Sequence, residues 1–207
     1  MKFSKEQKAI LIGTILGDAY LQKTGTKNAR LRLEHGYKQK DYLFWKVSQF
    51  PKLFQGQPKY LERKHPLSHQ IYKYWRHQSN STPELDKWQK IFYENGKKQI
   101  PANLADLLRD PLSLAVWYMD DGYYYPRDRV SYLYLGRVSK KEAELANTAL
   151  EKNFKIFSKV LDKKQKGFAL YFSRNETIKF HKTIKKFVLP IFNYKLLDPV
   201  TTDPLNG

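Results

Sequence analysis

Hydrophobic and polar positions in the first half of the chain switch between a helical period and a strand-like period. Apolar residues at three- and four-residue spacings predict three helices, at 5–18, 38–50 and 82–95. Alternation at every second residue predicts two β-hairpins, formed by 19–25 with 28–35 and by 57–64 with 69–78. The first half therefore has the predicted order αββαββα.

The second half repeats this order of elements. Helices are predicted at 111–120, 140–153 and 176–188, and hairpins are predicted from 122–129 with 130–138 and from 155–164 with 167–174. A short linker helix is predicted at 101–108. We expect an α+β fold of two pseudo-symmetric αββαββα halves, 1–100 and 111–197, joined by a linker, 101–110, and followed by a proline-rich C-terminal extension, 198–207.

Several helix ends carry local signals. The dipeptide Asn95–Gly96 is expected to end the third helix, and Pro190 is expected to stop the last one. Two helix starts show a serine followed three residues later by glutamate, the spacing of a capping box. This spacing occurs at Ser81 with Glu84, around Pro83, and at Ser139 with Glu142.

Strand alternation assigns side chains to the two faces of each predicted sheet, because successive side chains of a strand point to opposite sides. The inward set, expected to pack against helices, is Ala29, Leu31 and Leu33, then Ile71, Lys73 and Trp75, then Phe168, Leu170 and Phe172. The outward set is Asn28, Arg30, Arg32 and Glu34, then Gln70, Tyr72, Tyr74, Arg76 and Gln78, then Ala169, Tyr171 and Ser173. The outward faces are polar and mostly basic, so they form candidate binding surfaces.

The charge of the chain indicates what such a surface binds. The 207 residues contain 38 Lys and Arg against 20 Asp and Glu, a formal net charge of +18. A charge excess of this size favours a polyanionic partner. The 15 Tyr and 12 Phe residues are interleaved with the basic ones, which favours nucleic acid over a membrane surface. An ordinary solvated basic surface is the alternative.

Composition and motifs exclude several other classes of protein. The chain has no cysteine, which removes disulfides, cysteine-ligated zinc and thiol nucleophiles, and is compatible with an intracellular, reducing compartment. Neither a P-loop nor a dinucleotide-binding glycine run is present, so no nucleotide cofactor is expected. No uninterrupted apolar stretch is long enough to span a bilayer, and the first ten residues lack the features of a signal or transit peptide, so no membrane association is expected.

Two nine-residue segments, LIGTILGDA at 11–19 and LAVWYMDDG at 114–122, end their helices in the same way. Their alignment places Asp18 opposite Asp121. A carboxylate at a helix C-terminus is disfavoured by up to about 1 kcal/mol, because this end of the helix dipole is negative. The duplicated carboxylate therefore needs a partner that offsets this cost.

The segments resemble the motif of the LAGLIDADG homing endonucleases, and two copies in one chain resemble the monomeric, intron-encoded branch of that family. KKQIP at 97–101 and NYKL at 193–196 extend the resemblance from about Lys5 to Leu197. One departure concerns the small residues by which the motif helices approach each other. The first copy has Gly13 and Gly17, whereas the second has Val116 and Asp120.

The resemblance implies a fold, a reaction and a set of residues. The two motif helices would pack side by side at a pseudo-twofold axis, with the antiparallel sheets forming a DNA-binding saddle. Asp18 and Asp121 would bind Mg²⁺, or Mn²⁺ in its place, beside the scissile phosphates of the two strands. The Ala19 backbone carbonyl and, less strongly, Asp120 are further candidate ligands. Lys98 and Lys195 are the candidate catalytic lysines, with Lys97 as the neighbour if the register is shifted by one.

The side chains expected to contact DNA lie on the outward faces and in the adjoining turns. In the first half they are Gln22, Lys23, Asn28, Arg30, Arg32, Arg63, Lys64, Gln70, Tyr72, Tyr74 and Arg76. In the second half they are Tyr123, Tyr125, Arg127, Tyr132, Tyr134, Arg137, Lys163, Lys164, Tyr171 and Ser173.

The resemblance predicts an endonuclease that acts as a monomer on double-stranded DNA and makes a double-strand break at one long, asymmetric site. An RNA-binding intron maturase on the same scaffold and a non-catalytic DNA-binding protein are the alternatives. The predicted location is an organelle matrix or a prokaryotic cytoplasm. The target bases do not follow from the sequence, because each polar side chain on a strand accepts several base edges.

Overall fold

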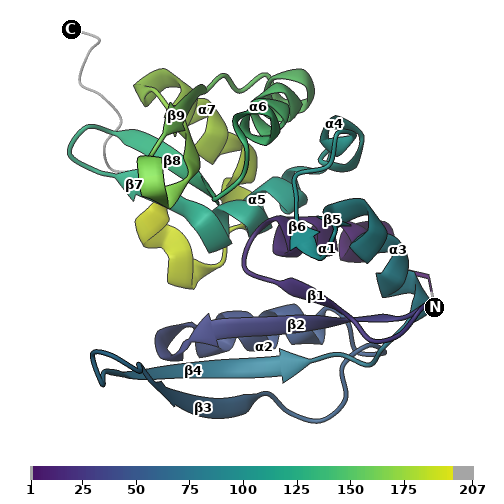
Figure 1. Cartoon of the computed structure of the whole chain (residues 1–207). Coiled ribbons are helices and arrows are strands. Elements are labelled where there is room, and N and C mark those ends of the chain that lie inside the picture. Colours follow the sequence, from purple (N-terminus) through teal and green to yellow (C-terminus); the bar gives the residue numbers. More distant parts are fainter. Residues whose placement is uncertain (1, 198–207) are drawn as a thin grey trace, which may run out of the picture. The chain divides into compact units, whose positions relative to one another are not determined.

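The structure is a computed structural model that describes residues 2–197 (Figure 1). It divides into two compact units, with the boundary between Lys98 and Gln99. The side-by-side packing of the two motif helices stays a prediction. The predicted extension at 198–207 lies outside the described residues. Within 2–197, no helix is long and apolar enough to cross a membrane.

The first unit is a four-stranded antiparallel sheet with helices on one face. Its elements are α1 (Lys5–Leu16), β1 (Tyr20–Lys23), β2 (Ala29–Gly36), α2 (Lys40–Ser48), β3 (Lys59–Lys64), β4 (Ile71–Gln78), α3 (Pro83–Phe92), β5 (Tyr93–Glu94) and β6 (Lys97–Lys98). The strand order is β1-β2-β4-β3, and β5 and β6 form a separate two-stranded hairpin. Both α2 and α3 pack against β2, which leaves the other face of the sheet uncovered by helices of this unit.

The second unit repeats this architecture. Its elements are α4 (Leu104–Leu107), α5 (Pro111–Asp121), β7 (Gly122–Tyr125), β8 (Val130–Gly136), α6 (Lys140–Phe154), β9 (Lys159–Asp162), β10 (Phe168–Phe172) and α7 (Arg174–Ile184), followed by the short 3-10 helices η3 (Lys185–Phe187) and η4 (Pro190–Lys195). The strand order β7-β8-β10-β9 matches that of the first sheet. The predicted α+β fold with two repeated antiparallel halves is confirmed.

The segment expected to link the halves is part of the second unit. The helix α4 packs against α6. The Asn153 side-chain amide donates hydrogen bonds to the carbonyl oxygens of Ala105 and Leu108, at 2.8 Å each. These bonds satisfy carbonyls at the end of a very short helix, which could not be stable alone.

The predicted start and end of the third helix are wrong. Thr82, not Ser81, is the N-cap, and its hydroxyl accepts a hydrogen bond from the Leu85 amide. The helix stops at Phe92, and Asn95–Gly96 forms the turn between β5 and β6, with φ angles of 49° and 76°. Two successive positive φ angles are typical of the tight turn for which Asn-Gly is favoured in hairpins.

The last predicted helix also has different bounds. It begins at Arg174, so Ser173 occupies its N-cap position and is not the strand residue that the alternation predicted. It ends at Ile184, before Pro190, which instead occupies the first turn of η4, where its missing amide costs nothing. The capping box of Ser139 and Glu142 at the start of α6 is confirmed.

The inward and outward sets are confirmed along β2. Ala29, Leu31 and Leu33 are at most 1% exposed, and the alternating residues on the other face are half-buried. In β4 the inward prediction is wrong for Ile71, which is 55% exposed, and for Lys73, which is also exposed. The turn between β3 and β4 extends past α2, so neither face is covered there (Figure 1).

In β10 the inward residues Leu170 and Phe172 are buried, and Phe168 is half-buried. Ala169 belongs to the outward face by register but is 0% exposed. It lies between the larger residues Tyr134 and Leu161 on the neighbouring strands, which leaves its small side chain covered.

The face assignment predicts opposite effects for two neighbouring residues. Leu33→Ala is expected to lower the free energy of unfolding by about 2 to 5 kcal/mol, because it leaves a cavity behind a side chain that is 1% exposed. Arg32→Ala, on the half-exposed face, is expected to change stability far less. Urea unfolding of the two variants checks this ranking, and the reverse ranking would mean that the alternation has the wrong phase.

Candidate active site and nucleic-acid interface

The first candidate acid lies just beyond the end of α1. Gly17 is the C-cap, and its amide donates to the Gly13 carbonyl oxygen at 3.0 Å. Asp18 follows, with 43% of its side chain exposed and Oδ2 at 3.6 Å from Nδ1 of His35. His35 lies on the helix-covered face of β2 and its side chain is 1% exposed. The structure thus brings a buried imidazole to the acid, and the sequence prediction missed this histidine.

A signal for His35 was present in the alternation itself. It continues the inward series of Leu31 and Leu33, so it places a polar ring where apolar side chains are expected. A buried polar side chain needs a partner, and such a position is more informative than an exposed one.

Asp18 and His35 open onto a shallow pocket of about 420 Å³. Its other lining residues are Tyr20, Arg32, Glu34, Gly36 and Gln39. Carboxylate oxygens are the ligands that Mg²⁺ and Mn²⁺ prefer, whereas imidazole suits softer transition metals such as Zn²⁺. The chemistry of this donor set therefore fits a divalent cation at Asp18.

The candidate lysine of the first unit is bound to the end of the same helix. Lys98 Nζ donates hydrogen bonds to the carbonyl oxygens of Ile15 at 2.9 Å, Gly17 at 2.5 Å and Ala19 at 3.3 Å. These bonds satisfy helix-terminal carbonyls and place a positive charge at the negative end of the helix dipole. The lysine therefore offsets part of the cost of a carboxylate at this position.

The β5–β6 hairpin positions Lys98. Lys98 pairs with Tyr93 across the hairpin, and the Tyr93 hydroxyl accepts a hydrogen bond from the Leu21 amide of β1 at 3.0 Å. Burial raises the pKa of Tyr93 to about 12, so the phenol stays neutral. The Asn95–Gly96 turn, predicted only as a helix end, is thus the feature that brings the lysine to α1.

The second unit has a corresponding arrangement at the end of α5. Asp120 and Asp121 are in the last turn of the helix, whereas Asp18 follows its helix. Lys195, from η4, donates from Nζ to the carbonyl oxygens of Met119 at 2.8 Å and Asp120 at 3.4 Å. Each unit therefore places one lysine on the carbonyls that end its motif helix.

The residue after the second acid must be glycine. A Cβ at Gly122 would lie 2.1 Å from Cδ2 of the Tyr118 ring and 2.4 Å from the Tyr118 carbonyl oxygen. Both distances are far inside van der Waals contact, so a larger residue would displace the helix end. In the first unit the chain leaves its helix differently, and the aligned position is Ala19.

A buried polar network holds the segment that carries Lys195. The Tyr118 hydroxyl donates to the Lys195 carbonyl oxygen at 2.8 Å, and His181 Nε2 lies 3.1 Å from this hydroxyl and 2.9 Å from Ser131 Oγ. His181 Nδ1 accepts a hydrogen bond from the Leu197 amide at 2.9 Å. Because Nδ1 is an acceptor, the ring proton of the neutral tautomer is on Nε2. Burial lowers the pKa of His181 from 6.5 to about 3.

The neutral histidine predicts a loss of stability in acid. Between pH 6.5 and about 3 this side chain is protonated in the unfolded chain but neutral in the fold, so unfolding takes up a proton. The free energy of unfolding is expected to fall as pH drops below about 6.5, by roughly 2 kcal/mol at about pH 5. Urea unfolding of the wild type and of His181→Gln, at about pH 6.5 and at about pH 5, measures this contribution. Equal losses in the two proteins would contradict it.

On the open face of the first sheet, register brings most of the predicted DNA-contacting residues together. Gln22 pairs with Arg30, and Arg30 Nε donates to the Gln22 side-chain oxygen at 2.9 Å. The residues that share this face are Gln22, Arg30, Arg32, Arg63, Tyr72, Tyr74 and Arg76. Asn28 and Gln70 immediately precede β2 and β4.

Two lysines predicted to contact DNA, Lys23 and Lys64, lie on the face opposite Arg30 and Arg63, and their contact with DNA stays a prediction. Lys23 pairs with Ala29 and forms an ion pair with Asp86 of α3. Lys64 pairs with Ile71 and alternates with Arg63. Hairpin register decides which face of the sheet each of these side chains occupies.

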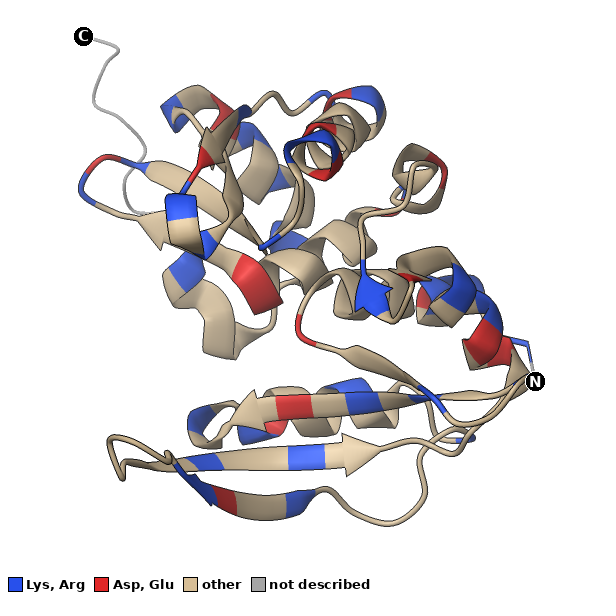
Figure 2. Cartoon of the chain, viewed as in Figure 1, with Lys and Arg blue, Asp and Glu red and all other residues tan. Residues whose placement is uncertain are grey.

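The open face of the second sheet is aromatic rather than charged. Tyr123, Tyr132 and Tyr171 are aligned across β7, β8 and β10, and Lys163 Nζ lies 4.7 Å from the Tyr132 ring centroid. Figure 2 shows basic segments on β2, β3 and β4 of the first unit, whereas charge near β7 and β8 is concentrated at their turn. Of the other predicted contacts, Tyr125 and Tyr134 are on these strands, Arg127 and Arg137 follow β7 and β8, and Lys164 begins a short 3-10 helix at Lys164–Lys166.

Comparison with known proteins agrees with this architecture. The model of the LAGLIDADG DNA endonuclease family matches residues 8–180. A probable intron-encoded endonuclease 1 from Wickerhamomyces canadensis is 30% identical over 199 residues, which cover 94% of this chain and 85% of the relative. A RecA protein from Mycobacterium shimoidei is 27% identical over 209 residues, which cover 94% of this chain and 47% of the relative.

A solved structure shares the fold closely. The homing endonuclease I-WcaI bound to its DNA recognition sequence superimposes with a TM-score of 0.87 at 30% identity, covering 95% of this chain and 88% of that one. The family model, the endonuclease relative and the solved structure all indicate the same family. The chain belongs to the LAGLIDADG DNA endonuclease family.

Proposed function

We propose that this protein is a site-specific homing endonuclease that makes a double-strand break in a long, asymmetric DNA site by metal-dependent phosphodiester hydrolysis. The observation that carries the proposal is the repeated constellation of an acid and a helix-capping lysine, Asp18 with Lys98 and Asp121 with Lys195. Because both copies of the motif lie in one chain, we propose that it acts as a monomer.

The carboxylates of Asp18 and Asp121 would hold Mg²⁺, or Mn²⁺ in its place. Asp120 and the Ala19 carbonyl are additional candidate ligands, although the Ala19 oxygen also accepts from Lys98. A divalent cation bound there lowers the pKa of a water molecule and stabilises the charge that develops on the phosphate.

The chain's own residues have separate tasks in this proposal. Lys98 and Lys195 fix the ends of the motif helices and add positive charge beside the acids, which favours a phosphate in the site. The arginines of the first sheet and the tyrosines of the second contact the duplex. Phosphate contacts supply affinity, and side chains that reach base edges in the major groove supply discrimination.

Selection of cleavable sites from a randomised duplex library tests the proposal. The protein is expected to linearise a plasmid that carries the selected site in Mg²⁺ and to leave it intact in EDTA. Specific DNA binding with no cleavage in Mg²⁺ or Mn²⁺ would indicate a non-catalytic DNA-binding protein. Preferential binding of an intron RNA without DNA cleavage would indicate a maturase. The two intact motif acids favour the nuclease.

A further inference from the structure

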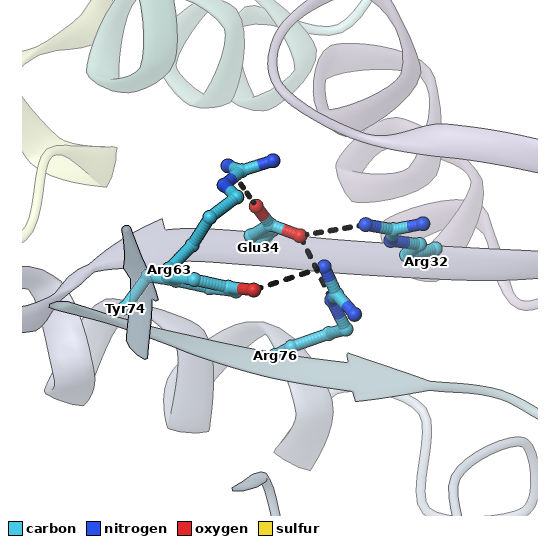
Figure 3. Close-up of polar contacts among 5 residues, drawn as sticks. All are labelled: Arg32, Glu34, Arg63, Tyr74 and Arg76. Atoms are coloured by element: carbon cyan, nitrogen blue, oxygen red, sulfur yellow. Dashed lines mark hydrogen bonds and ion pairs between the residues drawn. The ribbon is translucent and has the colours of Figure 1, made fainter. Parts of the chain in front are cut away.

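An acidic side chain lies among the basic ones on the open face of the first sheet. Glu34 Oε2 accepts a hydrogen bond from Arg32 Nη2 at 2.9 Å and another from Arg76 Nε at 2.8 Å (Figure 3). Its second oxygen, Oε1, is 3.5 Å from Nη2 of Arg63. The three arginines come from β2, β4 and β3, so one carboxylate connects three strands.

The carboxylate is ionised and offsets a repulsion. Burial alone would raise the pKa of Glu34, but the hydrogen bonds from Arg32 and Arg76 outweigh burial and hold the pKa below its usual value. Without this negative charge, three guanidinium groups would face one another across neighbouring strands. Charge-assisted hydrogen bonds of this kind are stronger and more directional than neutral ones.

An aromatic ring further restricts the arginines. Arg76 Nη2 donates to the Tyr74 hydroxyl at 3.3 Å, and the guanidinium carbons of Arg76 and Arg63 lie 5.2 Å and 5.4 Å from the Tyr74 ring centroid. Each guanidinium has several N–H donors, and Glu34 takes only part of them. The remaining donors are thereby held in a fixed orientation, which bidentate contact with a guanine edge requires.

We propose that Glu34 is a specificity-determining positioning residue that orients Arg32, Arg63 and Arg76 toward guanines in the half of the target read by the first sheet. This inference rests on the proposed function. Glu34 would also place a negative charge near the phosphates, which penalises sequences where no base contact offsets it. Discrimination is a difference between affinities, so both effects increase it.

The test compares Glu34→Gln with Glu62→Gln as a matched control. Glu62 is also on the first sheet and contacts Tyr60 and Lys73, but register places it on the opposite face. Both substitutions remove one negative charge and keep the side-chain shape. The readouts are base preference in the library selection and affinity for a duplex of random sequence over a salt series, with thermal unfolding to confirm that each variant is folded.

Glu34→Gln is expected to bind the random duplex more tightly, to steepen its salt dependence by up to about one unit, and to lower discrimination for guanines about tenfold. Glu62→Gln is expected to keep the wild-type base preference. An unchanged base preference in Glu34→Gln would overturn the inference while leaving the proposed function intact. Failure of the wild type to select any cleavable site would instead refute the proposed function.

Arg76→Lys distinguishes positioning from direct reading. It keeps the charge but loses the planar fork, so it is expected to relax preference at some of the base pairs affected by Glu34→Gln. The double variant should then lose less than the sum of the single losses, because the two residues act as one unit. A different outcome would overturn the inference: Glu34→Gln loses base preference at a single base pair, and this loss adds to that of Arg76→Lys in the double variant. Glu34 would then read a cytosine directly rather than position the arginines.

Discussion

Asp18→Asn and Asp121→Asn are each expected to abolish double-strand cleavage of the target site and to leave specific DNA binding largely intact. Asparagine keeps the shape of the side chain but removes the charge that a divalent cation requires. We expect cleavage to slow by about a thousandfold or more, since loss of metal-assisted catalysis acts on the chemical step rather than on DNA affinity. Linearisation of a plasmid carrying the selected site measures the rate, and gel-shift titration in Ca²⁺ measures binding.

Asp120→Asn is the matched control for this prediction. It removes a neighbouring carboxylate from the same helical turn as Asp121, so it changes the local charge equally. We expect it to be the milder substitution of the adjacent pair. A greater loss for Asp120→Asn than for Asp121→Asn would shift the motif alignment by one residue, and an unchanged rate in Asp18→Asn would remove that residue from the site.

The order of elements could be predicted because it depends on local periodicity. Leu31 and Leu33 alternate with Arg30 and Arg32, and a strand with one apolar face can bury it in only one phase. The capping box of Ser139 has the same local character, since its bonds connect residues of one helical turn. Such features need no knowledge of what lies across the fold.

Features that depend on distant partners could not be predicted in the same way. The dipeptide Asn95–Gly96 is typical both of a helix end and of a hairpin turn, and the structure has the turn. The hydrogen bond from the Leu21 amide to the Tyr93 hydroxyl holds this hairpin against β1, and its partners are far apart in sequence. Lys23 and Lys64 are among the predicted DNA contacts, but only the register of their hairpins shows that they lie on the face opposite Arg30 and Arg63. Alternation shows that successive side chains of a strand point to opposite faces. It does not show which face a given residue of a short strand occupies.

The candidate site shows the same division. The positions of Asp18 and Asp121 at the ends of the motif helices follow from the aligned motifs. The proximity of His35 to Asp18 and the arginine cluster around Glu34 depend on strand pairing and helix packing, because their members come from separate elements. The helix-capping bonds of Lys98 and Lys195 likewise connect residues far apart in sequence.

Lys98→Ala and Lys195→Ala are expected to slow cleavage about a hundredfold with a much smaller loss of DNA affinity. Each lysine adds positive charge beside a motif acid, and a group that stabilises developing charge acts mainly in the transition state. Lys195→Ala is also expected to lower the free energy of unfolding by about 1 to 3 kcal/mol, because the carbonyls of Met119 and Asp120 lose a donor. Single-turnover cleavage, DNA titration and urea unfolding separate these effects.

Lys97→Ala provides the matched control, because Lys97 is exposed on the same strand as Lys98 and pairs with Glu94. Removal of its charge changes the net charge equally but leaves the three bonds at the end of α1 in place. We therefore expect Lys97→Ala to cleave at nearly the wild-type rate. If Lys97→Ala and Lys98→Ala slowed cleavage alike, general electrostatic attraction would explain both, and equal losses of binding and cleavage in Lys98→Ala would make that lysine a phosphate contact rather than a catalytic group.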